Sequence, residues 1–285
     1  MNVKRVGIVG CGIMGGGIAE VAALGGHEVF LKSREQATAD GTFAGIEKSI
    51  GKRVAKGGLQ EDDAASALAR ITATADHSAL AECDLVIESV VEDMVTKKHL
   101  FRELDRICAE STILATNTST LPVVDMAMET GRPDRVCGIH FFNPAPLMNL
   151  VEIVRPITAA DETIATASAF AEACGKTPVI VKDQAGFIVN ALLFPYLNNA
   201  VRLLGQGVAS MEDIDAAMRG GCGFPMGPFQ LLDLVGLDTS VAILEALYEE
   251  FKDSHYAPVP LLRRMVAAER LGRKSGAGFY DYHRG

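Results

Sequence analysis

The alternation of short strand-like runs with longer helical patterns is the feature that most limits what this chain can fold into. Runs of β-branched and aliphatic residues recur as far as Asp183, and a helical pattern separates most of them. Such alternation is typical of a parallel sheet with crossover helices. We predict strands at 5–9, 28–32, 70–74, 85–88, 112–116, 135–140, 149–154 and 177–181, with helices at 14–24, 43–56, 97–108 and 162–174.

The pattern changes character after Asp183, where the strand-like runs stop. Helices are predicted at 188–204, 211–218, 229–251 and 261–270. We therefore expect an α/β domain over residues 1–183 and an all-α C-terminal domain over residues 184–285. Within the first domain, a helical insertion near residues 43–69, broken only at Gly57-Gly58, separates the second and third strands, where one helix would be enough.

The composition excludes several classes of partner. A net charge of -9 argues against a nucleic acid, whose phosphates need a basic surface. No apolar run approaches the ~20 residues that span a bilayer. The six cysteines contain no Cys-x-x-Cys pair, so we expect free thiols in a reducing cytoplasm and no bound metal.

A glycine-rich turn directly follows the first predicted strand and opens the first predicted helix. It reads Gly10-Cys11-Gly12-Ile13-Met14-Gly15, which is the dinucleotide-binding spacing. Gly10 would make the tight turn, Gly12 would let the backbone approach a pyrophosphate, and Gly15 would let helix pack on strand. The helix start, at Ile13 and Met14, offers unpaired N–H groups to the phosphates. We therefore expect the first domain to be of the Rossmann type.

The end of the second strand bears on which cofactor is used. NAD sites usually carry an acidic residue there, which accepts hydrogen bonds from the ribose. Here the strand runs directly into Ser33 and Arg34, which can bind a 2′-phosphate instead. Glu35 takes the acidic role if the register differs by two residues. The pattern favours NADP(H), with NAD(H) as the alternative.

Several motifs in order resemble those of the L-3-hydroxyacyl-CoA dehydrogenase family, of the bacterial 3-hydroxybutyryl-CoA dehydrogenase kind. The resemblance covers nearly the whole chain. Its motifs are Gly10–Gly15, VIESVVED at 86–93, TNTSTL at 116–121, GIHFFNP at 138–144, GFIVN at 186–190, PMGP at 225–228, DLVGLD at 233–238 and GRKSGAGFY at 272–280.

The resemblance implies an enzyme of fatty acid metabolism that exchanges hydride between a nicotinamide and a 3-hydroxyacyl-CoA. It also implies a homodimer formed through the helical domain and an active site between the domains. By this resemblance His140 is the catalytic base and Glu152 its partner. The family commonly has Asp where this chain has Ser33, and Arg where it has Ala191; the first departure puts the usual NAD preference in doubt.

The resemblance also assigns ligand contacts that local spacing alone does not identify. They fall into three groups, which are the surroundings of substrate and nicotinamide (Ser119, Asn143 and Asn190), the cofactor contacts (Glu92, Lys97 and Lys274) and the CoA contacts (Ser49 and Lys56). The CoA contacts lie in or beside the basic run that includes Lys48 and Lys52, which a solvated helix face would explain equally well.

The proposed chemistry suits these residue types. Oxidising a secondary alcohol requires a base whose pKa lies near neutrality, and histidine needs the least tuning. His140 and Glu152 lie on neighbouring predicted strands, and the segment 143–146 turns the chain between them, so a carboxylate–imidazole pair is expected. Ser119 and Asn190 would then hydrogen-bond the reacting oxygen.

Two other substrate classes fit the same chemistry, an acyl chain on a carrier protein and a sugar acid. A third reading is an inactive nucleotide-binding or structural protein. The complete set of His140, Glu152, Ser119 and Asn190 argues against inactivity, and assays with acetoacetyl-CoA, its carrier-linked analogue and L-gulonate separate the enzyme hypotheses.

Overall fold

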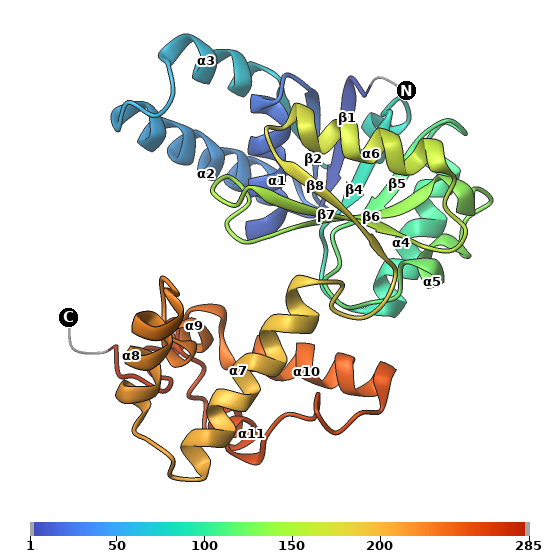
Figure 1. The fold of residues 1–285 in the computed structure, drawn as a ribbon. Helices are drawn as coiled ribbons and strands as arrows, with labels where there is room; N and C mark the ends of the chain where they lie inside the picture. Colours follow the sequence, from blue (N-terminus) through green and yellow to red (C-terminus); the bar gives the residue numbers. More distant parts are fainter. Residues whose placement is uncertain (1–2, 283–285) are drawn as a thin grey trace. The chain divides into compact units, whose positions relative to one another are not determined.

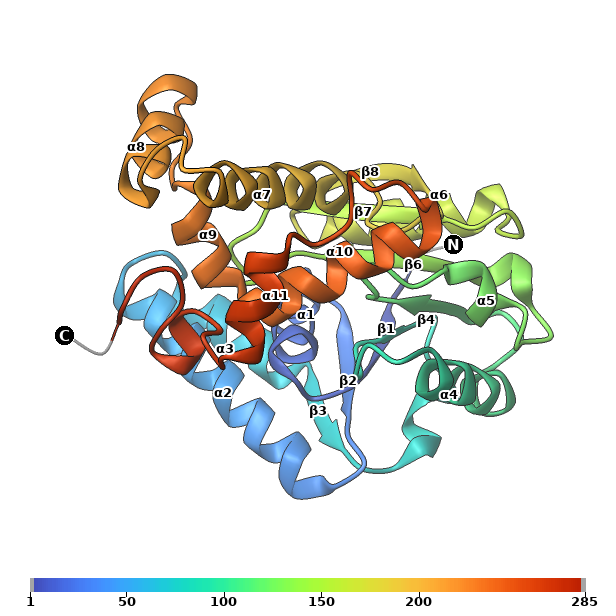
Figure 2. The ribbon, with the colours of Figure 1, turned by 90° about the horizontal axis from the view of Figure 1, so that it is seen from below.

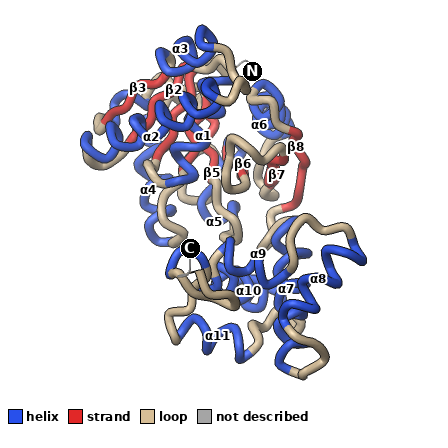
Figure 3. Tube along the Cα trace, turned by 90° about the vertical axis from the view of Figure 1, so that its left-hand side faces the viewer, coloured by secondary structure: helices blue, strands red, loops and turns tan. Residues whose placement is uncertain are grey.

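The computed structural model describes residues 3–282, and the chain divides after Asp183 into two compact units (Figure 1). All eight strands found within the described residues belong to the N-terminal unit. The C-terminal unit consists of helices and connecting loops (Figure 3). The expected fold class, an α/β domain followed by an all-α domain, is confirmed.

One eight-stranded sheet organises the N-terminal unit, in the order β3-β2-β1-β4-β5-β6-β7-β8. The strands are β1 (Arg5–Val9), β2 (Glu28–Lys32), β3 (Ile71–Thr74), β4 (Leu85–Glu88), β5 (Ile113–Thr116), β6 (Val136–Phe141), β7 (Leu150–Arg155) and β8 (Thr177–Lys182). Each lies within one residue of its predicted bounds. The prediction succeeds because strands covered on both faces need continuous apolar runs, which are easy to recognise.

The prediction of a parallel sheet is wrong at one pair of strands. β6 and β7 run antiparallel, while the other six neighbouring pairs are parallel. The short link between β6 and β7 explains this, because a parallel pair needs a crossover of a dozen or more residues. Residues opposite each other in an antiparallel pair project on the same face of the sheet.

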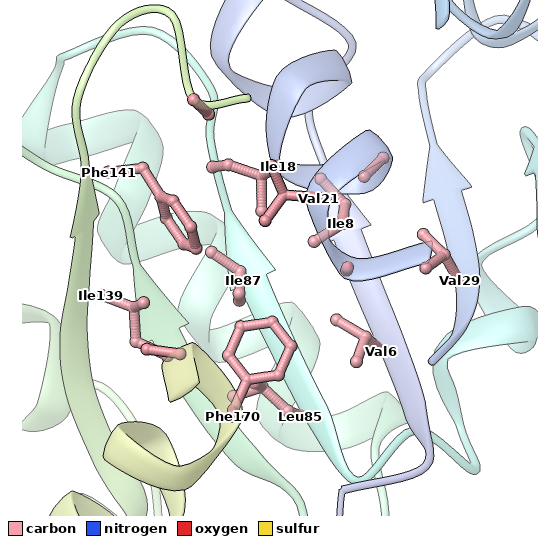
Figure 4. Close-up of a cluster of buried hydrophobic side chains, with 14 of the residues drawn as sticks. Val6, Ile8, Ile18, Val21, Val29, Leu85, Ile87, Ile139, Phe141 and Phe170 are labelled. Atoms are coloured by element: carbon pink, nitrogen blue, oxygen red, sulfur yellow. The ribbon is translucent and has the colours of Figure 1, made fainter. Parts of the chain in front are cut away.

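Helices cover both faces of this sheet. On one face α1 (Ile13–Leu24) and α6 (Asp161–Ala173) pack on the strands, with Ile18, Val21 and Phe170 among the buried side chains that meet Ile8 and Ile87 (Figure 4). On the other face lie α4 (Met94–Ile107) and α5 (Val123–Ala127), side by side in Figure 2. The 3₁₀ turns η1 (His77–Leu80) and η2 (Pro133–Arg135) complete the connections.

A buried histidine lies at the edge of this core. His27 precedes β2 and is 7% exposed, with its ring 5.0 Å from that of Phe170. Its Nδ1 donates to the carbonyl of Val3 at 3.1 Å. Burial lowers the pKa of His27 below its ordinary value. The folded unit therefore favours the neutral imidazole.

The helical insertion is larger than predicted. It consists of α2 (Gln36–Ala55) and α3 (Glu61–Ala69), which form a hairpin beside α1 (Figure 1). The predicted start at residue 43 was wrong because the first two turns of α2 bury only Ala39 and so carry little apolar periodicity. Ile46 and Ile50 anchor the helix to the main core.

The C-terminal unit has a separate core, formed around Phe194, Phe229 and Leu247. Its helices are α7 (Val189–Gly205), α8 (Met211–Cys222), α9 (Pro228–Val235), α10 (Leu237–Phe251) and α11 (Pro260–Ala267), with the 3₁₀ turn η3 (Arg273–Ser275). The single helix predicted at 229–251 is wrong. Gly236 interrupts it with a φ of 101°, a conformation that side chains disfavour.

Across residues 3–282, the structure contains no helix that combines the length and the apolar character needed to cross a membrane.

Candidate active site

The glycine-rich turn connects β1 to α1 in the conformation that the spacing predicts. Gly10 has a φ of 117°, and a Cβ there would lie 2.3 Å from the carbonyl oxygen of Ser89. A Cβ on Gly15 would lie 1.8 Å from the carbonyl oxygen of Gly10. Both positions therefore admit only glycine. The turn is compact because strand, turn and helix approach one another at backbone distance.

The remaining glycine of the motif has a different surrounding. A Cβ added to Gly12, the N-cap of α1, would meet no described atom within 4 Å. In the described structure α1 has no side-chain cap and no acidic residue in its first turn. Ile13 is exposed and Met14 is half-buried. The N–H groups at this helix start thus have no side-chain cap and Gly12 leaves room beside them, which fits a phosphate of a dinucleotide.

The end of β2 places Ser33 and Arg34 next to this turn. The N–H of Gly10 donates to the carbonyl of Lys32, and the N–H of Ser33 donates to the carbonyl of Thr74. Ser33 is half-buried and Arg34 is exposed. Glu35, the other candidate for ribose binding, is exposed and forms the N-cap of α2, beyond the end of the strand.

Lys32 is a nearby cation that the sequence analysis did not identify. It is the last residue of β2 and is 2% exposed, and its Nζ lies 2.8 Å from Nε2 of His77. Burial and the neighbouring Arg34 lower the pKa of Lys32. A lysine that ends an otherwise apolar strand was the available signal. Its burial depends on η1 and could not be read from the sequence.

The predicted carboxylate–imidazole pair forms between the two antiparallel strands. His140 on β6 lies directly opposite Glu152 on β7. Nδ1 of His140 donates to Oε2 of Glu152 at 2.7 Å. His140 is 3% exposed and Glu152 is 0% exposed. Every residue of β6 is buried, so polar side chains are costly there unless they are paired. The strand register provides that pairing.

Ser119 meets the other nitrogen of the same ring. Its Oγ lies 3.1 Å from Nε2 of His140. With Nδ1–H directed at Glu152, Nε2 carries the lone pair and accepts from the Ser119 hydroxyl. The result is a chain of three side chains, Ser119, His140 and Glu152, contributed by the loop after β5 and by β6 and β7. This arrangement can accept a proton at Nε2 and stabilise the resulting positive charge through the carboxylate.

A second polar cluster lies next to Ser119. Lys97 on α4 is 1% exposed, and its Nζ is 2.5 Å from Glu88 and 3.2 Å from Glu92. Oε1 of Glu92 accepts from the N–H of Ser119 at 3.0 Å. Lys97 is thus not a surface residue, and it is held by two carboxylates. Glu92 and Lys97 were predicted as site residues from the sequence, whereas Glu88, which lies at the end of β4, was not.

Asn143 lies in the loop between β6 and β7, three residues after His140, and is exposed. The peptide bond from Asn143 to Pro144 is cis. The preceding loop, after β5, is tied to β6 because Oδ1 of Asn117 accepts from the N–H of Phe141 at 2.8 Å. Loops from two neighbouring strands therefore meet at the carboxyl ends of β5 and β6, where open α/β sheets bind their ligands.

The predicted CoA contacts lie on the insertion. Ser49 is half-buried on α2, and Lys56 is exposed at its C-cap. The exposed Lys48 and Lys52 precede Lys56 at intervals of four residues, so the three lysines share one side of the helix. Arg53 is partly occupied by an ion pair with Glu20 at 3.3 Å.

The last two predicted site residues belong to the C-terminal unit. Asn190 is the second residue of α7 and is 7% exposed. Lys274 lies in η3 and is exposed, with its Nζ 2.6 Å from Asp238. Among residues 3–282 there is no cluster of three or more His, Cys, Asp or Glu side chains that is arranged to hold a metal ion.

Comparison with known proteins identifies the family to which the chain belongs. The family model described as the 3-hydroxyacyl-CoA dehydrogenase NAD binding domain matches residues 5–184, and the model of the C-terminal domain of the same family matches residues 186–282. A 3-hydroxybutyryl-CoA dehydrogenase of Clostridioides difficile is 45% identical over 98% of this chain and 100% of its own length. One of Mycobacterium tuberculosis is 46% identical over 98% of this chain and 99% of its own length.

A solved structure agrees with these sequence matches. The crystal structure of (S)-3-hydroxybutyryl-CoA dehydrogenase from Ralstonia eutropha superimposes with a TM-score of 0.97 at 42% identity, covering 99% of this chain and 100% of that one. The matches span both units of the chain. This protein therefore belongs to the 3-hydroxyacyl-CoA dehydrogenase family.

Proposed function

We propose that this enzyme interconverts (S)-3-hydroxyacyl-CoA and 3-oxoacyl-CoA, with a short acyl chain such as that of 3-hydroxybutyryl-CoA. The observation that carries the proposal is the buried chain of Ser119, His140 and Glu152 in a domain of the NAD-binding family. The names of the relatives support the substrate class.

In the oxidation direction His140 removes the hydroxyl proton of the substrate. Nε2 is the accepting nitrogen, because Nδ1 donates to Glu152. The carboxylate stabilises the imidazolium that forms, and it keeps the ring oriented. Ser119 and Asn190 donate hydrogen bonds to the substrate oxygen, which carries negative charge when the ketone is reduced. In that direction His140 returns the proton.

The nicotinamide cofactor supplies hydride transfer when it is bound. The turn from Gly10 to Gly15 fits its pyrophosphate, since the start of α1 has no side-chain cap and Gly12 has no described atom within 4 Å of an added Cβ. Glu92, Lys97, Ser119, Asn143 and Lys274 are the proposed contacts of the ribose and nicotinamide portion. Lys97 is buried between carboxylates, so its main contribution is to orient Glu92.

We also propose that NADP(H) is the preferred cofactor. Ser33 and Arg34 replace the carboxylate that would repel a 2′-phosphate, and Lys32 and His77 add cationic or donor groups nearby. Glu35 lies past the strand end as a helix N-cap and is less well placed to bind a ribose.

Steady-state kinetics test the cofactor preference. The value of kcat/KM should be higher with NADPH than with NADH, and Ser33→Asp should lower it for NADPH by roughly 10- to 150-fold, as expected for loss of a charge-assisted contact. The matched variant Ser33→Ala should have a smaller effect, because it adds no repulsion. Preference for NADH in the unaltered enzyme would refute the proposal.

The CoA portion is proposed to bind along α2. Ser49 can hydrogen-bond the ligand, and Lys56 can pair with a CoA phosphate, supported by the neighbouring Lys48 and Lys52. The same row suits the phosphopantetheine of a carrier protein. Acetoacetyl-CoA, an acetoacetyl carrier protein and L-gulonate should be assayed in parallel. A Lys56→Ala variant should raise KM only for substrates that carry the phosphate.

We further propose a homodimer formed through the helical unit. That unit exposes large apolar side chains, among them Leu192 on α7 and Leu234 on α9. Sedimentation velocity should give about twice the mass of 30.3 kDa. A monomer at micromolar concentration would refute this point without affecting the proposed chemistry.

The central experiment replaces the base. His140→Gln should still fold and bind the cofactor, whereas turnover of acetoacetyl-CoA should fall severely. The reason is that glutamine keeps a polar group of similar size but cannot carry a proton between states. Turnover equal to that of the unaltered enzyme would refute the assignment of His140 as the base.

A further inference from the structure

A buried carboxylate at the end of β4 has no role in the chemistry proposed above. Glu88 is 0% exposed, and none of the ligand contacts proposed above involves it. Its Oε1 accepts from the N–H of Val90 at 3.2 Å and from Lys97 at 2.5 Å, and its Oε2 accepts from the hydroxyl of Thr116 at 3.0 Å. Burial raises the pKa of Glu88, and the ammonium of Lys97 opposes that rise.

Lys97 joins this carboxylate to a second one. Its ammonium lies between Glu88 and Glu92, at 2.5 and 3.2 Å respectively. Glu88 is fully buried, whereas Glu92 is 41% exposed. A buried ammonium needs a compensating charge, so the position of Lys97 depends chiefly on Glu88. Glu92 is then held by an ammonium that is itself fixed to the sheet.

Glu92 in turn holds the loop that carries Ser119. Its Oε1 accepts from the N–H of Ser119 at 3.0 Å and from the hydroxyl of Thr118 at 2.5 Å. The same Thr118 hydroxyl accepts from the N–H of Leu121 at 3.1 Å. One carboxylate oxygen therefore fixes two consecutive residues of the turn, and the second of them is hydrogen-bonded to His140.

A shorter route reaches the same turn from Glu88. Thr116 lies opposite Glu88 in the β4–β5 register and donates its hydroxyl proton to it. The Thr116 oxygen accepts from the N–H of Thr118 at 3.1 Å. Glu88 thus acts on the Ser119 turn from two sides, through Lys97 and Glu92 and through Thr116.

We infer that Glu88 is a positioning residue for the reaction, which sets the placement of the Ser119 hydroxyl against Nε2 of His140. The inference rests on the proposed function, because it requires Ser119 and His140 to act on the substrate. Glu88 itself makes no contact with the reacting atoms. Its effect on kcat passes through the two routes described, both of which reach the turn containing Ser119; any effect through Glu92 on cofactor binding is removed by measuring kcat at saturating cofactor.

The substitution Glu88→Gln tests this role with little change in volume. The amide cannot neutralise Lys97, and one of its two ends would turn an N–H toward a neighbouring donor. Lys97 would then shift toward Glu92, and the Ser119 turn would lose part of its support. Misplacement of a reacting group by about 1 Å can lower the rate by roughly 100-fold, so kcat should fall by about 10- to 100-fold.

A double-mutant cycle on kcat separates positioning from a general structural defect. Glu88→Gln, Ser119→Ala and the double variant are measured with acetoacetyl-CoA and NADPH at saturation. If Glu88 acts through Ser119, adding Glu88→Gln to Ser119→Ala should change kcat by less than about twofold. An equal fold-loss in both backgrounds would overturn the inference while leaving the proposed function intact. No effect of Ser119→Ala alone would overturn the inference together with the role proposed for Ser119, whereas loss of the proposed function would show as absence of turnover in the unaltered enzyme.

A control and a second variant complete the experiment. Asp84 stands at the opposite end of β4 and accepts from the N–H groups of Lys4 and Arg5, so Asp84→Asn should lower stability but leave kcat unchanged in both backgrounds. Thr116→Val removes the hydroxyl that joins Glu88 to the N–H of Thr118 and keeps the side-chain shape. It should lower kcat by roughly 2- to 12-fold, and only when Ser119 is present. Its cycle tests the route through Thr116 even if Glu88→Gln does not fold, and an equal fold-loss with and without Ser119 would overturn the inference.

Discussion

Replacing Glu152 by Gln removes the negative charge next to the proposed base while nearly preserving the shape of the side chain. The carboxylate is fully buried and accepts from Nδ1 of His140 at 2.7 Å. The Gln amide oxygen can still accept this hydrogen bond, so the ring can keep its orientation. What is lost is the ion pair with the imidazolium, which exists only after proton transfer in the oxidation direction.

The size of the effect follows from burial. Breaking a buried, hydrogen-bonded ion pair costs about 3–5 kcal/mol. Because the charge develops toward the transition state, most of this cost is added to the barrier. At about 1.4 kcal/mol per factor of ten, kcat should fall by roughly 10²- to 10³·⁵-fold. Binding of the cofactor should change little, since the glycine turn belongs to β1 and α1.

The assay measures kcat for oxidation of 3-hydroxybutyryl-CoA, with cofactor binding followed separately by fluorescence. Asp105→Asn is the matched control, because it also converts a carboxylate to an amide and breaks an ion pair, that of Asp105 with Arg132 at 2.8 Å. Its kcat should stay close to that of the unaltered enzyme. If Glu152→Gln folds and keeps kcat within threefold, the reasoning from the buried pair is refuted.

Three further predictions follow from local features. Gly12→Ala should keep the melting temperature but weaken cofactor binding, whereas Gly15→Ala should lower stability by about 1–3 kcal/mol or prevent folding; thermal melts and cofactor titration check both. Because burial lowers the pKa of His27, the unfolded chain binds more protons below about pH 6.5, so stability should fall as the pH drops below that value. Urea unfolding of the unaltered protein and of His27→Gln at several pH values should show a smaller slope in the variant. Maleimide labelling of the half-buried Cys11 should slow when cofactor is added, while labelling of the exposed Cys222 should not. Equal slowing at both cysteines, or no slowing at Cys11, would contradict the proposed placement of the cofactor.

The sheet and the paired site residues could be predicted because both leave a short-range signal. Strands such as β4 and β6 are apolar runs bounded by turns, and His140 and Glu152 lie on consecutive strands that a short link joins. The antiparallel direction was implied by that link but conflicted with the general pattern of the domain. The length of a connection was here the better guide to strand direction than the alternation of elements.

The features that escaped prediction depend on contacts between distant segments. Glu88 and Lys97 look like solvated charges, because only the packing of α4 on the sheet buries them. Lys32 is buried by another distant contact, with His77 of η1. Gly236 lies in an apolar stretch with helical periodicity on both sides, and its positive φ cannot be recognised from composition. In each case the missing information is three-dimensional.

The antiparallel pairing of β6 and β7 places the proton-transfer pair, His140 and Glu152, on the sheet itself and not on the loop that joins the two strands. His140 and Glu152 are held opposite each other by the ladder of backbone hydrogen bonds between the strands, while the loop from 142 to 149 places Phe142 against the His140 ring and carries the proposed cofactor contact Asn143. Exposed residues further along that loop, such as Leu147, can therefore be exchanged without altering how the imidazole and carboxylate meet. The geometry of proton transfer is thus set by the sheet, and substitutions at such exposed loop positions leave it unchanged.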